Sequence, residues 1–349
     1  MDQRCSGEIA TAEVVTADHQ AQQHYLVNSL MEEAIRSSQL EGATTSRRMA
    51  KEMLQTGRAA RDRSELMILN NYRALQFMRE IGDQLTPGAI LELHRILTEG
   101  TLDDPGAAGR IQTVDDERVV VTDASTGRVL HVPPPADQLE RRMQALCDFA
   151  NQELAVAQQF MHPVVRAILL HFWLAYDHPF EDGNGRTARA LFYWDMRARG
   201  YWLVEYLSIS RILRKAPAKY AKSFLLTETD GLDTTYFILH QLQVIQQAID
   251  ELHDYLRKQV REIKDVEQLV KGSAHFNQRQ LAVLSDAVRD PGARHTFGSH
   301  AASHGVTHET ARTDLQQLLE RGLLERNREG RRFIFSPAPG LPGILKTLR

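Results

Sequence analysis

The sequence predicts a mainly α-helical protein with one β-hairpin, followed by a small α+β domain at the C-terminus. Three observations carry this prediction. Apolar residues recur at helical spacing up to about residue 270, two β-branched runs interrupt that pattern near residue 125, and the last 75 residues or so alternate short helices with two strands. The chain has 349 residues, 42% of them hydrophobic and 25% charged, which suits two or three folded domains.

The first helices follow from apolar spacing and their end signals. Apolar residues between Tyr25 and Ala34 lie on one helical face, and the pattern stops near Gly42. Two further helices are predicted over Ser64–Ile81 and Thr86–Leu97, the second with a proline at its first turn.

A hairpin and a long helix complete this part. The segment Arg118–Val132 has two β-branched runs around a Ser-Thr-Gly turn, which is typical of a β-hairpin, and three prolines end it. A long helix is predicted from Thr234 to Val270, and Gly272 and Ser273 mark a linker. These boundaries divide the chain into an N-terminal helical segment, a core domain and a C-terminal domain, at residues 1–60, 61–270 and 275–349.

The C-terminal domain reads as three helices and two strands. The helices are predicted in NQRQLAVLSDAV, SHAASHG and HETARTDLQQLLERG, and the strands flank the charged turn Asn327–Gly330. This order resembles a winged helix-turn-helix. Arginines on the third helix and the wing suit a nucleic-acid backbone, whereas nearby acidic residues dilute them, so a DNA partner and a protein partner both stay open. The arginines are Arg312, Arg326, Arg328, Arg331 and Arg332, and the acids are Glu309, Asp314, Glu320 and Glu325.

The segment with the most chemistry is HPFEDGNGRTAR, which begins at His178 and lies between two predicted helices, the second running from about Thr187. A glycine-rich turn at a helix N-terminus presents free backbone amides to an anion. Arg186 and Arg189 share one helix face and suit a polyphosphate. Asp182 offers a hard oxygen ligand for Mg²⁺, and His178 is a base that titrates near neutral pH. Together they imply attack by a hydroxyl on a nucleotide phosphate.

This segment matches the Fic signature HPFx(D/E)GNGRxxR at every fixed position, and the chain resembles the Fic family from about residue 25 to 250. The resemblance implies a Fic-type helical core and a protein adenylyltransferase that uses ATP and Mg²⁺ to modify a Ser, Thr or Tyr hydroxyl. It implies a β-hairpin flap, at about Val119 to Val132, along which the target protein docks by strand pairing. Self-modification fits the same activity.

The resemblance also assigns roles within the motif. His178 is the general base, Asp182 binds the metal, and Phe180 anchors the loop. Gly183, Asn184 and Gly185 form the anion hole, while Arg186 and Arg189 hold the β- and γ-phosphates. Relatives of the Doc type carry lysine in place of the second glycine and transfer phosphate, so Gly185 argues against that reaction. Other relatives transfer UMP or phosphocholine, which the motif does not distinguish.

Ser37–Gly42 (SSQLEG) fits the family's inhibitory motif [S/T]xxxE[G/N], at the end of a predicted helix upstream of the core. By that resemblance Ser37, Glu41 and Gly42 form a brake, and Glu41 pairs with Arg189 in place of the γ-phosphate. A bidentate carboxylate–arginine pair competes directly with phosphate. In some relatives the glutamate also supports removal of AMP, so that reaction stays open here.

Bulk properties place further bounds. The net charge of −3 and the lack of a long apolar run indicate no membrane partner, and the two cysteines, Cys5 and Cys147, suit a reducing, cytoplasmic setting. Relatives often dimerise, so a homodimer stays open. A second function class also remains: a DNA-binding transcriptional regulator whose Fic core senses nucleotide.

Overall fold

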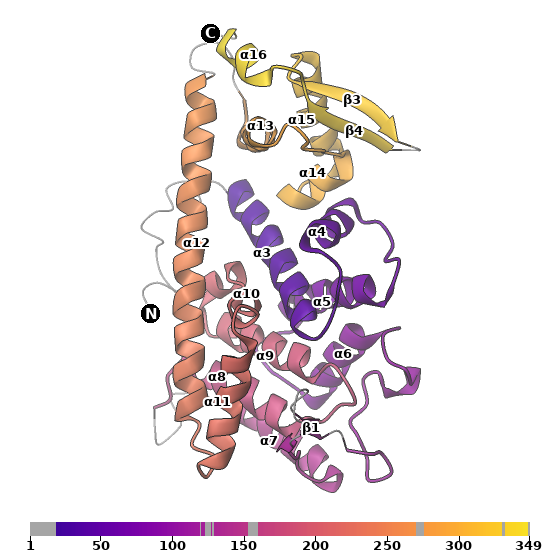
Figure 1. Cartoon of the computed structure of the whole chain (residues 1–349), viewed down its shortest axis with the longest axis vertical. Helices are drawn as coiled ribbons and strands as arrows, with labels where there is room; N and C mark the ends of the chain where they lie inside the picture. Colours follow the sequence, from indigo (N-terminus) through magenta and orange to yellow (C-terminus); the bar gives the residue numbers. More distant parts are fainter. Residues whose placement is uncertain are drawn as a thin grey trace. The chain divides into compact units, whose positions relative to one another are not determined.

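The computed structural model describes residues 19–118, 120–122, 127, 129–152, 160–269, 276–329 and 332–347. They form two compact units (Figure 1). The first contains Leu30–Ala50 and Ala60–Ile249, so the segment with the inhibitory motif belongs to the same unit as the glycine-rich loop. The second contains the described residues up to Ser29, the segment Lys51–Ala59 and the residues from Asp250 onward. Three helices contribute residues to both units: α3 (His19–Leu40), α4 (Arg47–Thr56) and α12 (Thr235–Leu269).

The first unit is a helical domain with a large apolar core. Its remaining helices are α5 (Arg63–Glu80), α6 (Pro87–Thr98), α7 (Leu139–Asn151), α8 (Pro163–Asp177), α9 (Asn184–Ala198), α10 (Ile209–Leu213) and α11 (Pro217–Thr229), with 3₁₀ turns η1 (Pro105–Ala107), η2 (Ala136–Gln138) and η3 (Trp202–Tyr206). Leu93, Leu170, Phe180, Leu191 and Trp194 are all buried in the core that α6, α8 and α9 share. Among the described helices, none combines the length and the apolar content that a membrane span requires.

Local signals in the sequence begin these helices where predicted. The Thr86 side chain accepts a hydrogen bond from the amide of Ala89 and Pro87 opens α6, while His162 and Pro163 do the same for α8. The helix after the motif differs from the prediction, because α9 begins at Asn184 and not near Thr187. Gly183 has φ +85° and turns the chain directly into the helix, so the Gly-Asn-Gly turn overlaps its first turn.

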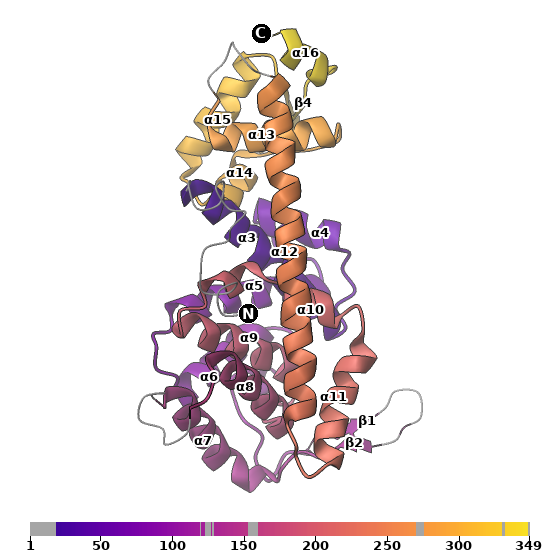
Figure 2. The ribbon, with the colours of Figure 1, turned by 90° about the vertical axis from the view of Figure 1, so that its left-hand side faces the viewer.

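The predicted hairpin is present among the described residues. Strand β1 (Val121–Thr122) pairs antiparallel with β2 (Val129–His131), with an irregular register between them. Figure 2 shows both strands beside α11. Val119 and the Ser-Thr part of the predicted turn lie outside the described residues, as do Gly272 and Ser273 of the predicted linker.

The second unit has its own core and the predicted order of elements. Helices α13 (Gln278–Arg289), α14 (Phe297–His304) and α15 (His308–Glu320) precede β3 (Leu324–Glu329), β4 (Arg332–Pro337) and α16 (Leu341–Thr347). The two strands pair antiparallel around buried Phe335. The prediction of a turn at Asn327–Gly330 was wrong in its first three residues. They belong to β3 and pair with β4, while Gly330 and Arg331 lie outside the described residues.

The sequence suggested that Asp314 dilutes the positive surface charge of this unit, and that prediction was wrong. Asp314 is 2% exposed, and its carboxylate accepts hydrogen bonds from Asn277 and Arg279 and contacts His300. These partners hold the pKa of Asp314 well below its usual range, because hydrogen bonds and the Arg279 charge outweigh burial. The Asp314 carboxylate therefore connects α13, α14 and α15 in the interior of the unit. The identification as a winged helix stays a prediction.

Candidate active site

The loop from His178 to Gly183 joins α8 to α9 and is fixed by its own side chains. Phe180 is fully buried and stacks on His94 of α6, with ring centroids 3.7 Å apart. The side chain of Asn184 closes the loop, because it accepts from the amide of Phe180 (3.0 Å) and donates to its carbonyl (2.8 Å). Both Phe180 and Asn184 thus act inside the loop, and Asn184 has only its backbone amide to offer a ligand.

The N-terminus of α9 provides the anion-binding geometry. Its first helical hydrogen bond runs from the amide of Thr187 to the carbonyl of Gly183, so the amides of Asn184, Gly185 and Arg186 have no partner within the helix. Gly183 must be glycine, because its φ is positive and a Cβ there would lie 2.8 Å from the methyl group of Thr98. The three amides and the helix dipole together favour a bound anion.

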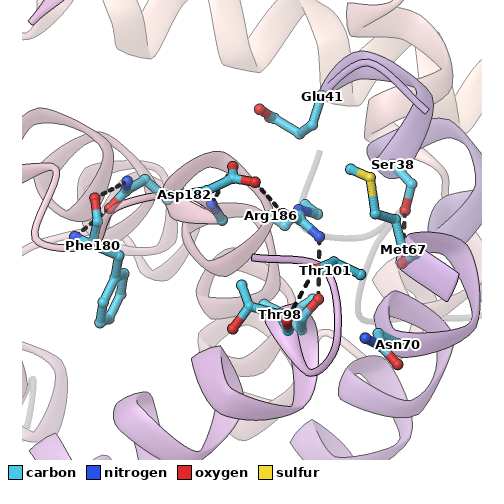
Figure 3. A network of polar contacts seen from close by, with 12 residues as sticks. Ser38, Glu41, Met67, Asn70, Thr98, Thr101, Phe180, Asp182 and Arg186 are labelled. Atoms are coloured by element: carbon cyan, nitrogen blue, oxygen red, sulfur yellow. Dashed lines mark hydrogen bonds and ion pairs between the residues drawn. The ribbon is translucent and has the colours of Figure 1, made fainter. Parts of the chain in front are cut away.

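Arg186 is buried beneath this turn. Its guanidinium donates to the Leu97 carbonyl (3.1 Å) and to the Asp182 carboxylate (3.2 Å). Figure 3 shows the contact with Asp182. Burial lowers the pKa of Arg186, although the charges of Asp182 and Glu41 oppose this shift. The guanidinium is therefore a fixed positive charge whose position is set by groups of its own domain.

Arg189 lies one turn further along α9 and contacts the inhibitory motif. Its Nε donates to Ser37 Oγ (2.9 Å), and its Nη2 donates to the Glu41 carboxylate (2.8 Å). Only one oxygen of Glu41 is used, so the predicted bidentate pair is not formed. The carbonyl of Ser37 also accepts from Nη2 (3.3 Å), so Ser37 bonds the guanidinium at two points. Among the described residues Nη1 has no partner, and it lies toward Gly185.

Glu41 reaches the site because the chain turns just after α3. The amides of Glu41, Gly42 and Ala43 bond back to the last turn of α3, and Gly42 has φ +96°. Figure 3 shows the Glu41 carboxylate above the Asp182–Arg186 pair. A Cβ on residue 185 would collide with Glu41 Oε1, so Gly185 is required for this approach. The carboxylate therefore lies over the N-terminus of α9.

His178 lies at the opposite end of the loop, in the left-handed conformation that ends α8 (φ 45°). Its Nδ1 is 3.4 Å from the Ala175 carbonyl, so a proton on Nδ1 leaves the lone pair on Nε2. Burial lowers the pKa of His178, and the nearby His131 and Arg118 contribute in the same direction, while the Ala175 carbonyl and Glu41 oppose it. The imidazole is thus kept neutral and able to accept a proton near neutral pH.

Asp182 is suited to a metal ion. Its side chain is 43% exposed, its Oδ1 accepts from the amide of Gly183, and its Oδ2 accepts from Arg186. The carboxylate keeps lone pairs that face away from these donors. Mg²⁺ is commonly held by one or two carboxylates together with phosphate oxygens, so Asp182 fits that role.

Two residues of the site were missed from the sequence. His94 accepts from the amide of Gly109 at Nδ1 (3.0 Å), so its Nε2 carries a proton and donates to the Asp182 carbonyl (2.8 Å). Burial lowers the pKa of His94 to about 4. Arg118 donates to the carbonyls of Asp177 and His178. The sequence pattern does not indicate either role, because both side chains bond residues that are far away in the chain.

A mainly helical domain with a glycine-rich loop on a helix N-terminus, two arginines on that helix and a histidine before the loop defines the Fic fold. A model of the Fic/DOC family matches residues 84–194, which include this loop and both arginines. Residues 84–194 are thus similar to the Fic/DOC family and include the whole of this loop.

Curated relatives and solved structures agree with this assignment. Protein adenylyltransferase Fic of Nematostella vectensis is 33% identical over 162 residues, or 44% of this chain and 34% of that protein. Protein adenylyltransferase fic-1 of Caenorhabditis elegans is 30% identical over 172 residues, or 46% and 30%. The chain thus spans about a third of the length of these relatives.

The structural comparisons concern the fold. A Fic family protein from Desulfovibrio desulfuricans has a TM-score of 0.53 at 19% identity, with 94% of this chain and 92% of that chain covered. Fic-1 of C. elegans has a TM-score of 0.50 at 21% identity, with 70% and 72% covered.

Proposed function

We propose that this chain transfers AMP from ATP to a hydroxyl group of a protein. The observation that carries the proposal is the arrangement on one loop and helix: amides without a helical partner at the start of α9, buried Arg186 and Arg189 behind them, and a neutral His178 at the other end. The names of the Nematostella and C. elegans relatives, both protein adenylyltransferases, support the same reaction.

In this proposal the polyphosphate of ATP binds the N-terminus of α9. The amides of Asn184, Gly185 and Arg186 donate to phosphate oxygens, and the two guanidinium groups neutralise the negative charge. Asp182 holds Mg²⁺, which when bound neutralises phosphate charge and orients the leaving group. Gly185 leaves space for the phosphate chain because it has no side chain.

The chemical step then needs only a base and an attacking oxygen. Nε2 of His178 removes the proton from the target hydroxyl as its oxygen attacks the α-phosphorus. A phosphorus–oxygen ester bond to the target forms, the bond to the bridging oxygen of the β-phosphate breaks, and pyrophosphate leaves with its electrons. The proton stays on His178 until solvent takes it.

The target protein docks along the flap in the same proposal. Among the described residues β1 and β2 pair only with each other, so the outer edges of this hairpin are available for pairing with a further strand. Val120, Val129 and Val132 are exposed at 40%, 51% and 66%. Backbone pairing and these apolar side chains would align a target segment beside His178.

We further propose that Glu41 is a brake on this reaction. Its carboxylate lies over the N-terminus of α9 and bonds to Arg189, which the γ-phosphate needs. A phosphate and a carboxylate cannot both occupy this place, because they are like charges and compete for one donor. ATP therefore binds productively only when Glu41 leaves.

Intact-protein mass spectrometry after incubation with ATP and Mg²⁺ tests this function. We compare the wild type, Glu41→Gly, and Glu41→Gly combined with His178→Ala, with and without cell lysate as a source of targets. We expect AMP transfer with Glu41→Gly, weak transfer with the wild type and none with the double variant. ATP labelled at the α- or the γ-phosphate distinguishes transfer of AMP from transfer of phosphate.

A parallel incubation with UTP and with CDP-choline tests the other donors. Transfer only from one of these would replace AMP in the proposal and keep the roles of His178 and Glu41. Absence of transfer from every donor, in lysate and with Glu41→Gly, would overturn the proposed function.

A further inference from the structure

Arg118 lies where the chain enters the flap, and its guanidinium makes four hydrogen bonds. It donates to Gln112 Oε1 (2.5 Å), and to the carbonyls of Asp177 (2.9 Å), His178 (2.9 Å) and Pro134 (3.0 Å). Among the described residues its Nε has no partner, although it is buried. The four bonds alone therefore set the orientation of the guanidinium.

These partners belong to three segments that are separate in the sequence. Gln112 and Arg118 precede the flap, Pro134 follows it, and Asp177 and His178 end α8. The amide of Gln112 also donates to the carbonyl of Pro179 (2.8 Å). Both ends of the flap are thus tied to the three residues around the proposed base.

The two carbonyls at the end of α8 explain why a cation suits this place. The last carbonyls of a helix have no partner within it and carry partial negative charge. His178 also ends the helix in a left-handed conformation, which few residues other than glycine adopt readily. An arginine that bonds both carbonyls stabilises this turn and fixes where the imidazole projects.

We propose that Arg118 is a positioning residue that couples the seating of the flap to the placement of His178, so that the target hydroxyl and the base are brought into register by one side chain. This inference rests on the proposed AMP transfer. Arg118 itself contacts neither the proposed phosphate site nor the target hydroxyl. Its loss should therefore affect the chemical step and target binding, and leave ATP binding unchanged.

Arg118 also adds a positive charge close to the imidazole. Among the described residues, three titratable or charged groups act on His178: Glu41 after α3, His131 on β2 and Arg118 before β1. The carboxylate of the preceding residue, Asp177, pairs with Arg142 of α7. The Arg118 charge lowers the pKa of His178. Removing it should shift the acid limb of the rate profile to higher pH, whereas a lysine should preserve the charge but not the four bonds.

The test uses the full chain with Glu41→Gly as the parent, to which Arg118→Gln, Arg118→Lys or Arg110→Gln is added. Arg110 is a matched control, because it removes a cation from the same loop but bonds Asp116 and the Ile111 carbonyl instead of α8. We expect Arg118→Gln to lower kcat by about 10- to 100-fold with the KM for ATP unchanged. Arg118→Lys should lower kcat while keeping the parent's pH profile, and Arg110→Gln should match the parent.

A second measurement does not depend on activity. The imidazole of His178 is titrated by NMR in histidine-labelled protein, and its signal is assigned as the one lost in His178→Ala. We expect Arg118→Gln, but not Arg118→Lys, to raise the pKa of His178. Thermal unfolding monitors folding, and the lysine variant keeps the test open if the glutamine variant unfolds.

The outcomes separate this inference from the proposed function. If the parent transfers AMP and Arg118→Gln matches it in kcat and pH profile, Arg118 has no positioning role and the proposed function stands. If the parent transfers nothing, an unchanged His178 titration in Arg118→Gln still overturns the inference. A fall in kcat equal to that of Arg110→Gln also overturns it.

Discussion

The regions around Arg186 and Arg189 differ in what holds each guanidinium. Both arginines are on α9, three residues apart, and both are buried. Arg186 donates to Leu97 and Asp182, which belong to the Fic domain itself. Arg189 donates to Ser37 and Glu41, which lie at the end of α3, outside the residues matched by the family model.

The pKa shifts of the two arginines follow their partners. Burial lowers the pKa of both guanidinium groups, but at Arg189 the charge and hydrogen bond of Glu41, together with Tyr220 and Glu33, outweigh burial and the net shift is upward. Arg186 is thus a permanent part of the phosphate site, whereas Arg189 is occupied by a group that can be replaced by phosphate. One helix supplies both a fixed and a switchable half of the site.

The largest expected difference between the two arginines is in the free energy of unfolding. Arg186→Ala leaves the Leu97 carbonyl and Asp182 without their partner and empties a buried space, so we expect unfolding free energy to fall by about 2–4 kcal/mol. Arg189→Ala combined with Glu41→Gly removes both partners of an ion pair and should cost less. Urea denaturation measures both.

Activity provides the control for this pair. Arg186→Ala and Arg189→Ala, each combined with Glu41→Gly, should both lose AMP transfer, because each removes a guanidinium that binds phosphate. Equal losses of stability would show that Arg189 is as much a structural residue as Arg186, and the distinction between fixed and switchable halves would be wrong.

A smaller effect is expected from the other partner of Arg189. Ser37→Ala removes the hydroxyl that accepts from Arg189 Nε, while Glu41 stays in place. A typical hydrogen bond contributes roughly 1 kcal/mol, so we expect AMP transfer to rise about fivefold above wild type, well short of Glu41→Gly. Initial rates of AMP incorporation measure this.

Ser38→Ala is the matched control. Ser38 is adjacent on α3 and also buried, but its hydroxyl donates to the Met67 carbonyl and accepts from Asn71, with no contact to Arg189. Activation equal to that of Ser37→Ala would mean that loosening α3 in general releases the brake.

Much of this site was predictable from the motif, because one short segment carries the loop, both arginines, the carboxylate and the histidine. The contact between Glu41 and Arg189 was expected from the inhibitory motif and is present. His94 and Arg118 were not predictable. Their roles depend on which backbone groups lie opposite them after folding, and single polar residues in a helix or loop carry no signal of that.

The use of the Asn184 side chain was also not predictable. It bonds both backbone groups of Phe180 within the loop, so its backbone amide is what it can offer to the predicted anion site.

The smallest expected effect concerns pH and compares the two ways of releasing the brake. His178 must be neutral to accept a proton, and its pKa lies below the ordinary value of 6.5 because of burial. Transfer should therefore persist below pH 6.5 and fall only at more acidic pH.

The Glu41 carboxylate raises the pKa of His178. Glu41→Gly should therefore move the acid limb of kcat/KM to lower pH than Ser37→Ala, which keeps the carboxylate. We expect a difference of less than about one pH unit, since the other charges around His178 are unchanged. Titration of ATP itself is common to both variants and cancels in the comparison. Coincident acid limbs would mean that Glu41 acts on Arg189 alone and that the two ends of the loop are electrostatically independent.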